Sequence, residues 1–284
     1  MAGFFGFFDY TKPGPGVPKN APPKPRIKVF FEIYFRKFWH LVKINMLFFV
    51  FNLPEVIFAL IISQVFLQDL TRSMGMQSND LNQLVFNFAV SAFFICLPII
   101  TVGPAQAGFT YVLRNFAREE HAFLWGDFKE HALSNMKQSL IVCIIDIIIL
   151  IVVGVDLNFY FHLNQRNLLH SILIGLTMLM SIIYIMMHLY IYPMMVTFKL
   201  SIKQIYKNAF IFSIIRFLPN LGIIAVCFIL SVLPVLIVPP VGILLFFFIT
   251  ISTVGLITNF YVYPSMKKFM IDKVQSTDKE VTNE

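Results

Sequence analysis

The sequence predicts an all-α, polytopic membrane protein with six transmembrane helices in three hairpins and with interfacial amphipathic helices between them. Hydrophobic residues make up 58% of the 284-residue chain and charged residues only 13%, with a mean hydropathy of +0.77. In a soluble domain about 25% of residues are charged. Several uncharged runs also exceed the roughly 18 residues that indicate a membrane span. We therefore expect one membrane domain, residues 29–266, between two tails, residues 1–28 and 267–284.

The positive charges predict how this domain is oriented. The net charge of +7 is compatible with nucleic-acid binding, but the basic residues stand at the ends of apolar runs rather than on a soluble module. We therefore expect no nucleic acid as a partner and the lipid bilayer instead. Of the 22 Lys and Arg residues, only Arg72 and Arg166 fall in segments assigned to the outer side. This bias predicts that both termini are cytoplasmic.

The N-terminal residues 1–28 are rich in Pro, Gly and Lys, and their prolines disfavour a helix. We expect a flexible cytoplasmic tail. Its phenylalanines, among them Phe4 and Phe8, either contact lipid or a partner or belong to a poorly ordered segment. From residue 29 a basic stripe and an aromatic stripe at helical spacing predict an interfacial helix, with Trp39 at headgroup level.

Six apolar runs follow. Between Asp80 and Arg114 no charge occurs for 33 residues, which as one helix would measure about 50 Å, too long for a hydrocarbon core of about 30 Å. Pro98, Gly103 and Pro104 predict a break in this run. We expect the turns after the break, to about Phe116, to run along the interface or out of it. The predicted spans are residues 44–67, 84–100, 139–155, 168–195, 221–238 and 241–261.

The connection between the second and third spans, residues 97–138, is the most charged connector between spans and is predicted to be a cytoplasmic elbow. Gly126, Asp127 and Glu130 fit a capping box that opens a short helix. We expect the elbow to be a docking surface. Its candidate residues are Arg114, Arg118, Glu119, Glu120, Trp125 and Asp127.

Residues 199–217 have the clearest amphipathic pattern in the chain. Lysines at four-residue spacing oppose an apolar face, and Pro219 with Asn220 is expected to end the helix. The two faces comprise Lys199, Lys203 and Lys207, and Ile202, Ile205, Ala209 and Phe212.

The exits of the fourth and sixth spans repeat one motif, Tyr-Ile-Tyr-Pro at residues 190–193 and Tyr-Val-Tyr-Pro at residues 261–264. Pro104 and Tyr111 after the second span are a looser version. The repeat indicates three related units, as in many transporters. Alternatively, Tyr and Pro are simply frequent at membrane interfaces.

Five polar residues are predicted at similar depth in the inner half of the bilayer. Because isolated charges are costly there, such residues usually face the bundle interior and find partners. One hypothesis is a polar cavity, open to the cytoplasm, that forms a substrate or ion pathway. The favoured alternative is a structural pair of Asp146 with His188. The five residues are Glu55, Asp146, His188, Asn52 and Asn259.

No sequence motif indicates a metal site, a cofactor or a catalytic constellation. Cys96, Cys143 and Cys227 lie in apolar runs without the spacing of metal ligands, so we expect buried, inert thiols. The sequence gives no reason to expect an enzyme.

The run LPIITVGPAQAGFTYVLRNFAREEHAFLWGDFKEHALSNMKQ, residues 97–138, resembles the YesL-like family of bacterial membrane proteins, which share a domain of unknown function. The family similarly has a Leu-Pro, a Thr-x-Gly-Pro-Ala, an aromatic-basic helix and a Trp/Phe-Asp-Phe stretch. The resemblance implies a multi-span protein of the bacterial plasma membrane, often linked with carbohydrate uptake systems of the ABC type. It brings no ligand and no functional residues.

These observations suggest two alternative functions of different classes. The first is an accessory or regulatory membrane protein whose cytoplasmic elbows bind ABC transporter subunits or a sensor protein. The second is a small secondary transporter with a polar inner-half cavity, which the repeat and the five polar residues favour.

Overall fold

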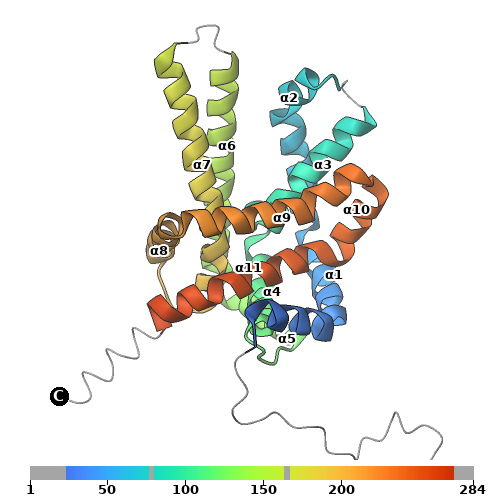
Figure 1. Ribbon diagram of the computed structural model, residues 1–284, viewed down its shortest axis with the longest axis vertical. Helices are drawn as coiled ribbons and strands as arrows, with labels where there is room; N and C mark the ends of the chain where they lie inside the picture. Colours follow the sequence, from blue (N-terminus) through green and yellow to red (C-terminus); the bar gives the residue numbers. More distant parts are fainter. Residues whose placement is uncertain (1–23, 77–79, 163–166, 272–284) are drawn as a thin grey trace, which may run out of the picture.

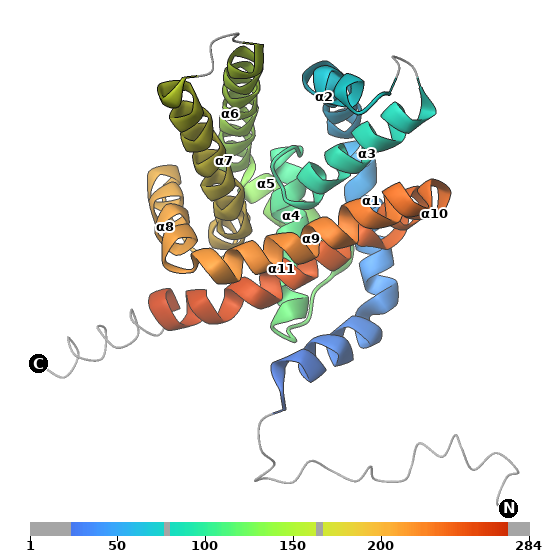
Figure 2. The same ribbon diagram turned by 45° about the horizontal axis from the view of Figure 1, so that its top comes forward.

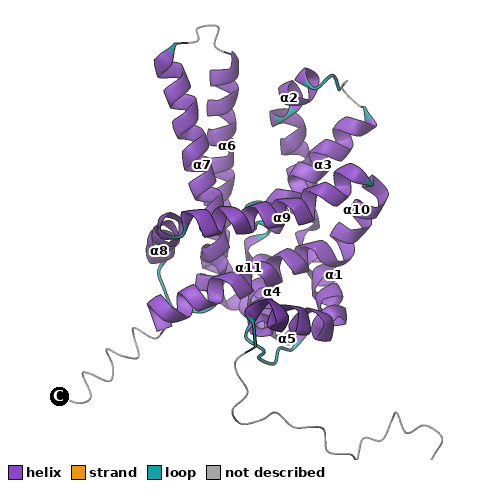
Figure 3. Ribbon diagram, in the orientation of Figure 1, coloured by secondary structure: helices purple, strands orange, loops and turns teal. Residues whose placement is uncertain are grey.

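The computed structural model describes residues 24–76, 80–162 and 167–271, and all regular structure within them is helical (Figure 3). The predicted flexible tail therefore falls largely outside the described residues, as does most of the predicted C-terminal tail. The helices are α1 (Arg26–Phe66), α2 (Gln68–Ser73), α3 (Leu81–Cys96), α4 (Gly103–Ala117), α5 (Leu124–Ser134), α6 (Met136–His162), α7 (Leu168–Met195), α8 (Ile202–Ile215), α9 (Phe217–Ile237), α10 (Pro239–Leu245) and α11 (Ile251–Met266), with π-helical turns η2 (Phe246–Thr250) and η3 (Lys267–Ile271).

Five of the described helical stretches are long and apolar enough to cross a membrane. They are α1, α6, α7, α9 and the continuous run Pro239–Met270 that joins α10 to α11. Figures 1 and 2 show α6 and α7 standing side by side, while α9 and α11 run across them. The composition that predicted a membrane protein is therefore matched by five candidate spans.

The predicted second span is shorter than expected. Helix α3 has 16 residues and ends at Cys96, where residues 84–100 were predicted to form the span. The cause is Pro98, which disfavours helical backbone in the residue before it, and Leu97 accordingly has a ψ of 81°. The predicted break is confirmed, but the 16-residue helix measures about 24 Å, less than the thickness of a hydrocarbon core.

Helix α4 packs against five other helices, α1, α5, α6, α7 and α11. Twelve of its fifteen residues are buried. These turns are thus enclosed by other helices, and their predicted position along or out of the interface stays a prediction. The small-residue sequence at the start of α4 lets neighbouring backbones approach.

Two glycines of α4 permit this approach. A Cβ atom at Gly103 would lie 2.2 Å from the carbonyl oxygen of Ser139 in α6. A Cβ atom at Gly108 would lie 2.3 Å from the carbonyl oxygen of Phe128 in α5. Real Cβ atoms do not come this close to a backbone oxygen, so only glycine allows α4 to pack at this distance.

Buried asparagines of α1 hold the irregular backbone around α4. The side-chain amide of Asn45 donates to the carbonyls of Phe246 (3.1 Å) and Phe247 (2.7 Å) in η2, and its oxygen accepts from the Ser252 N–H (2.8 Å). Asn52 Oδ1 accepts from the Val102 N–H at 2.6 Å, just before α4 begins. These bonds satisfy backbone groups that a π turn and a helix break leave unpaired.

The amphipathic prediction for residues 199–217 is confirmed on its apolar face. Ile205, Ala209 and Phe212 are buried, and a capping box between Ser201 and Gln204 opens α8. The predicted end was wrong, because α8 stops at Ile215 and Pro219 lies in the first turn of α9. A proline is tolerated there because its missing N–H has no intrahelical acceptor.

Three other boundaries differ from prediction. Helix α1 is one helix of 41 residues that begins at Arg26, so the interfacial helix and first span are continuous. Helix α6 extends to His162, through most of the predicted outer loop. Helix α5 begins at Leu124 rather than at Gly126, and Asp127 Oδ2 accepts from the Phe123 N–H at 2.9 Å instead of capping the helix start.

Candidate functional site

A buried polar network joins α6 and α7 beside α4. His188 Nε2 lies 3.2 Å from Asp146 Oδ1, and the two side chains are 0% and 2% exposed. The Tyr184 hydroxyl donates to the same carboxylate oxygen. The predicted pairing of Asp146 with His188 is thus present, and Tyr184 is a third member that the sequence analysis missed.

The polar residues that α7 contributes to this network are spaced so that they share one face of the helix. Tyr184, His188 and Tyr192 follow one another at four-residue intervals, so they lie along one face of the helix. Within an apolar span, this stripe of three polar aromatic residues was a signal that could have identified the network from sequence.

The network continues to a small cavity between α4, α7 and α11. Its volume of about 10 Å³ is enough for about one water molecule. Among the described residues, four side chains on its wall have a buried polar atom without a hydrogen-bond partner, a set that suits one ordered water. They are Gln106, His188, Tyr192 and Asn259.

The five predicted intramembrane residues are therefore only partly brought together. Asp146 and His188 are in contact, and Asn259 borders the cavity that His188 also lines. Asn52 instead bonds the Val102 N–H. Glu55 is half-buried on α1, and no hydrogen bond or ion pair connects it to another described residue.

The six residues predicted to form a docking surface on the elbow differ in their contacts, and only some of them are exposed. Arg114 Nη1 donates to the carbonyl of Val196 at 2.6 Å, which fixes the start of the α7–α8 connection. Glu119 pairs with Arg36 of α1 at 2.7 Å. The remaining positions are Arg118, half-buried over the ring of Tyr263, exposed Glu120, exposed Trp125 and Asp127, bonded to Phe123 N.

A groove of about 770 Å³, here called the connector groove, lies between residues 131–138 and residues 195–201. The Gln138 side-chain amide donates to the Leu200 carbonyl at 2.9 Å and so ties the two walls together. Lys137 and Lys199 are exposed on opposite walls, and none of the lining residues is acidic. The groove is therefore open and basic.

His131 stands at one end of the connector groove. Its ring stacks on that of Tyr111 with centroids 3.3 Å apart. Burial is the largest cause that lowers the pKa of His131 below its usual value, so the imidazole is neutral at neutral pH. The positive charge of the groove thus comes from its two lysines.

The two Tyr-x-Tyr-Pro motifs meet at one buried side chain. The hydroxyls of Tyr190 and Tyr261 both donate to Asn220 Oδ1, each at 2.7 Å. The Asn220 amide donates in turn to the carbonyls of Phe212 (3.2 Å) and Ser213 (3.4 Å). Asn220 therefore links α7, α8, α9 and α11.

We predict that Asn220→Leu destabilises the protein by about 1–3 kcal/mol for each hydroxyl that it leaves unpaired. Thermal unfolding in detergent measures this loss. Asn82, exposed on α3, provides the matched control, since Asn82→Leu should change stability by less than about 0.5 kcal/mol. Equal effects of the two substitutions would contradict the role given to Asn220.

Comparison with known proteins gives one match. Residues 41–157, from the middle of α1 into α6, match the model of a family described as "Protein of unknown function, DUF624". No curated protein and no solved structure matches the chain. The matched region includes α4, α5 and residues 131–138 of the connector groove. The chain is thus similar to a family of unknown function, and the YesL-like assignment stays a prediction.

Proposed function

We propose that this chain is an accessory or regulatory protein of the bacterial plasma membrane that docks on a carbohydrate ABC transporter or its sensor. The resemblance of residues 97–138 to YesL-like proteins supports the choice of partner system. In this proposal the chain has six spans: the five candidate spans and, second in chain order, α3 with the buried residues that follow it. The distribution of Lys and Arg supports cytoplasmic termini.

The size and charge of the connector groove are the main support for this proposal. It offers about 770 Å³ of open space, whereas the interior polar cavity holds about one water molecule. A sugar does not fit the interior cavity, but an extended peptide segment fits a groove of this size. Because Lys137 and Lys199 line the groove without an acidic neighbour on its walls, an acidic segment of the partner is the complementary ligand.

Copurification tests this docking. Full-length protein in native membranes is mildly crosslinked under conditions that express the uptake system, and transporter subunits are identified among the adducts. The double variant Lys137→Glu/Lys199→Glu reverses the charge of both walls, and we expect about tenfold less recovery of those subunits, since like charges oppose each other across an interface.

Lys203 and Lys207 supply the matched control. Both are exposed on α8 and lie outside the connector groove. The variant Lys203→Glu/Lys207→Glu carries the same change in net charge and should leave recovery unchanged. Absence of transporter subunits from the wild-type sample, or equal losses in both double variants, would overturn the docking proposal.

The buried Asp146–His188 pair favours the alternative of a small secondary transporter, because intramembrane ionisable residues often mark ion pathways. Flux through reconstituted protein distinguishes the two functions. A transporter would lose flux in Asp146→Asn or Glu55→Gln, whereas an accessory protein shows no flux to lose.

A further inference from the structure

A second hollow, independent of the connector groove, lies where the start of α1 meets the ends of α4 and α11. It measures about 310 Å³ and is here called the cationic pocket. Arg26, Arg118 and Lys267 line it, each from a different helical segment. Charges that are distant in sequence therefore converge on one small space.

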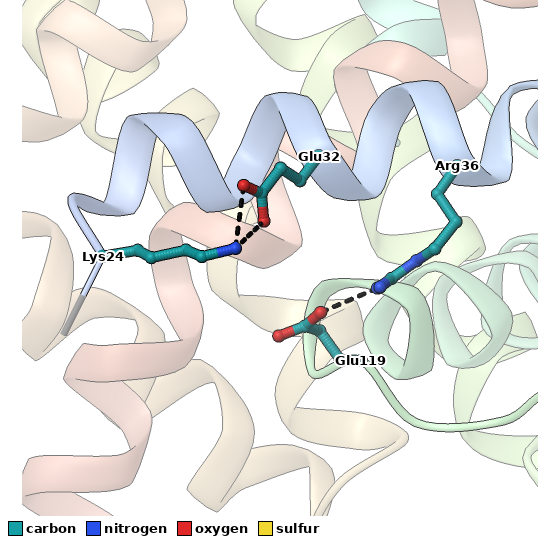
Figure 4. A network of polar contacts seen from close by, with 4 residues as sticks. All are labelled: Lys24, Glu32, Arg36 and Glu119. Carbon is teal, nitrogen blue, oxygen red and sulfur yellow. Dashed lines mark hydrogen bonds and ion pairs between the residues drawn. The ribbon is translucent and has the colours of Figure 1, made fainter. Parts of the chain in front are cut away.

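The one acidic residue on this wall is already paired. Glu119 accepts from Arg36 Nη2 at 2.7 Å, and Figure 4 shows its side chain directed at Arg36. Glu119 has a φ of 61° at the end of α4, and the bonds Glu119 N–Phe116 O and Glu120 N–Asn115 O close that helix end around it. The pocket thus keeps an excess of positive charge.

Arg118 gives the clearest indication of an anionic ligand. Its guanidinium lies 4.6 Å from the ring centroid of Tyr263. Its Nε and Nη2 atoms are buried and have no hydrogen-bond partner among the described residues. Buried charged donors without a partner are costly, and an anion in the pocket satisfies them.

Arg26 is held in place by a proline. Pro264 has no N–H, so the carbonyl of Phe260, four residues earlier in α11, lacks its helical donor. Arg26 Nη2 donates to that carbonyl at 2.7 Å, with the guanidinium 4.9 Å from the Phe260 ring centroid. Arg26 is therefore preorganised at the edge of the cationic pocket.

An apolar groove of about 620 Å³ begins at the same two residues, Arg26 and Phe260. It runs between the first turns of α1 and the helices α9 and α11. Its walls are almost entirely apolar and aromatic, including Phe31, Val226 and Leu230. A cationic pocket that opens into an apolar groove matches a phosphate group attached to a hydrocarbon chain.

We propose that this combined cleft binds one anionic phospholipid, with the phosphate between Arg26, Arg118 and Lys267 and an acyl chain along the apolar groove. Basic pockets between membrane helices commonly recognise anionic head groups. The continuity of the two hollows favours a lipid over a free phosphate, because a free phosphate leaves the apolar groove unused.

Native mass spectrometry of the full-length protein in detergent tests the proposal, with phosphatidylglycerol titrated against phosphatidylcholine. We expect wild-type protein to bind phosphatidylglycerol about tenfold more tightly and Arg118→Gln/Lys267→Gln to lose this preference. The control Lys203→Gln/Lys207→Gln removes two exposed positive charges from α8 and should keep it. Equal binding of both lipids by the wild type, or equal losses in both variants, would overturn the proposal.

A substitution in the apolar groove separates a lipid from a free phosphate. Val226→Trp fills the groove and leaves all three cations in place. We expect about tenfold weaker binding of phosphatidylglycerol and no displacement of the lipid by millimolar inorganic phosphate. Unchanged lipid binding together with displacement by phosphate would show recognition of phosphate alone. Because Val226 and Lys267 are partly or fully exposed, Val226→Trp and Lys267→Gln remain usable if Arg118→Gln fails to fold.

Discussion

Replacing Gly103 by alanine is expected to cost the protein about 3 kcal/mol of stability, the upper end of the range for overpacked cores. The added Cβ would lie 2.2 Å from the Ser139 carbonyl oxygen and 2.5 Å from its carbon. These are backbone atoms of α6 and cannot rotate away, so α4 and α6 must separate. Thermal unfolding in detergent measures the loss.

Gly175 and Gly222 provide matched controls within α7 and α9. A Cβ at either position meets no atom within 4 Å. Alanine should therefore stabilise the protein by about 0.5–1 kcal/mol, because it reduces the conformational freedom of the unfolded chain. A Gly103→Ala variant as stable as these controls would show that α4 does not pack on α6 as described.

His188→Leu is expected to destabilise the protein by about 3–5 kcal/mol, because it leaves the buried Asp146 carboxylate with only the Tyr184 hydroxyl. Asp146→Leu should also destabilise it, since it removes the acceptor of the Tyr184 hydroxyl and the ion-pair partner of His188. In the double variant Asp146→Leu/His188→Leu the total loss should be smaller than the sum, since neither buried polar group is then left without its partner.

Thermal unfolding of the four proteins in this cycle gives the coupling energy of the pair. Asp156→Leu, on the same helix but without a hydrogen bond or ion pair to another described residue, should show no coupling to His188→Leu. Additive losses for Asp146 and His188 would contradict the structural pair.

Features that a local pattern decides were predictable from the sequence. The four-residue spacing of lysines opposite Ile205, Ala209 and Phe212 correctly predicted the buried face of α8. Pro98 correctly predicted a break, because proline acts on its own neighbours. Asp146 and His188 were correctly suggested as a pair, since buried ionisable groups need partners.

Features that depend on packing between distant segments were not predictable from the sequence. Gly103 was interpreted only as part of a break, whereas Gly103 and Gly108 admit the backbones of α6 and α5. Nothing adjacent to Asn45 indicates that it bonds the π turn about two hundred residues later. Arg114 and Arg118 were assigned to an exposed elbow from charge alone, although both are partly buried.

We propose that the interior polar network is closed and that the connector groove, on the cytoplasmic side, is where the protein acts. Thiol labelling with a membrane-impermeant maleimide tests this proposal most directly. Single cysteines replace Lys199 in the groove and Asn259 beside the interior cavity, in a protein whose Cys96, Cys143 and Cys227 are changed to alanine.

We expect rapid labelling of Lys199→Cys when the reagent reaches only the cytoplasmic face, and none when it reaches only the outer face. Asn259→Cys should stay unlabelled from both faces until the protein is unfolded, since the cavity it borders holds about one water. Labelling of Asn259→Cys from the cytoplasm as fast as Lys199→Cys would show that the interior cavity is open and would indicate a transport pathway.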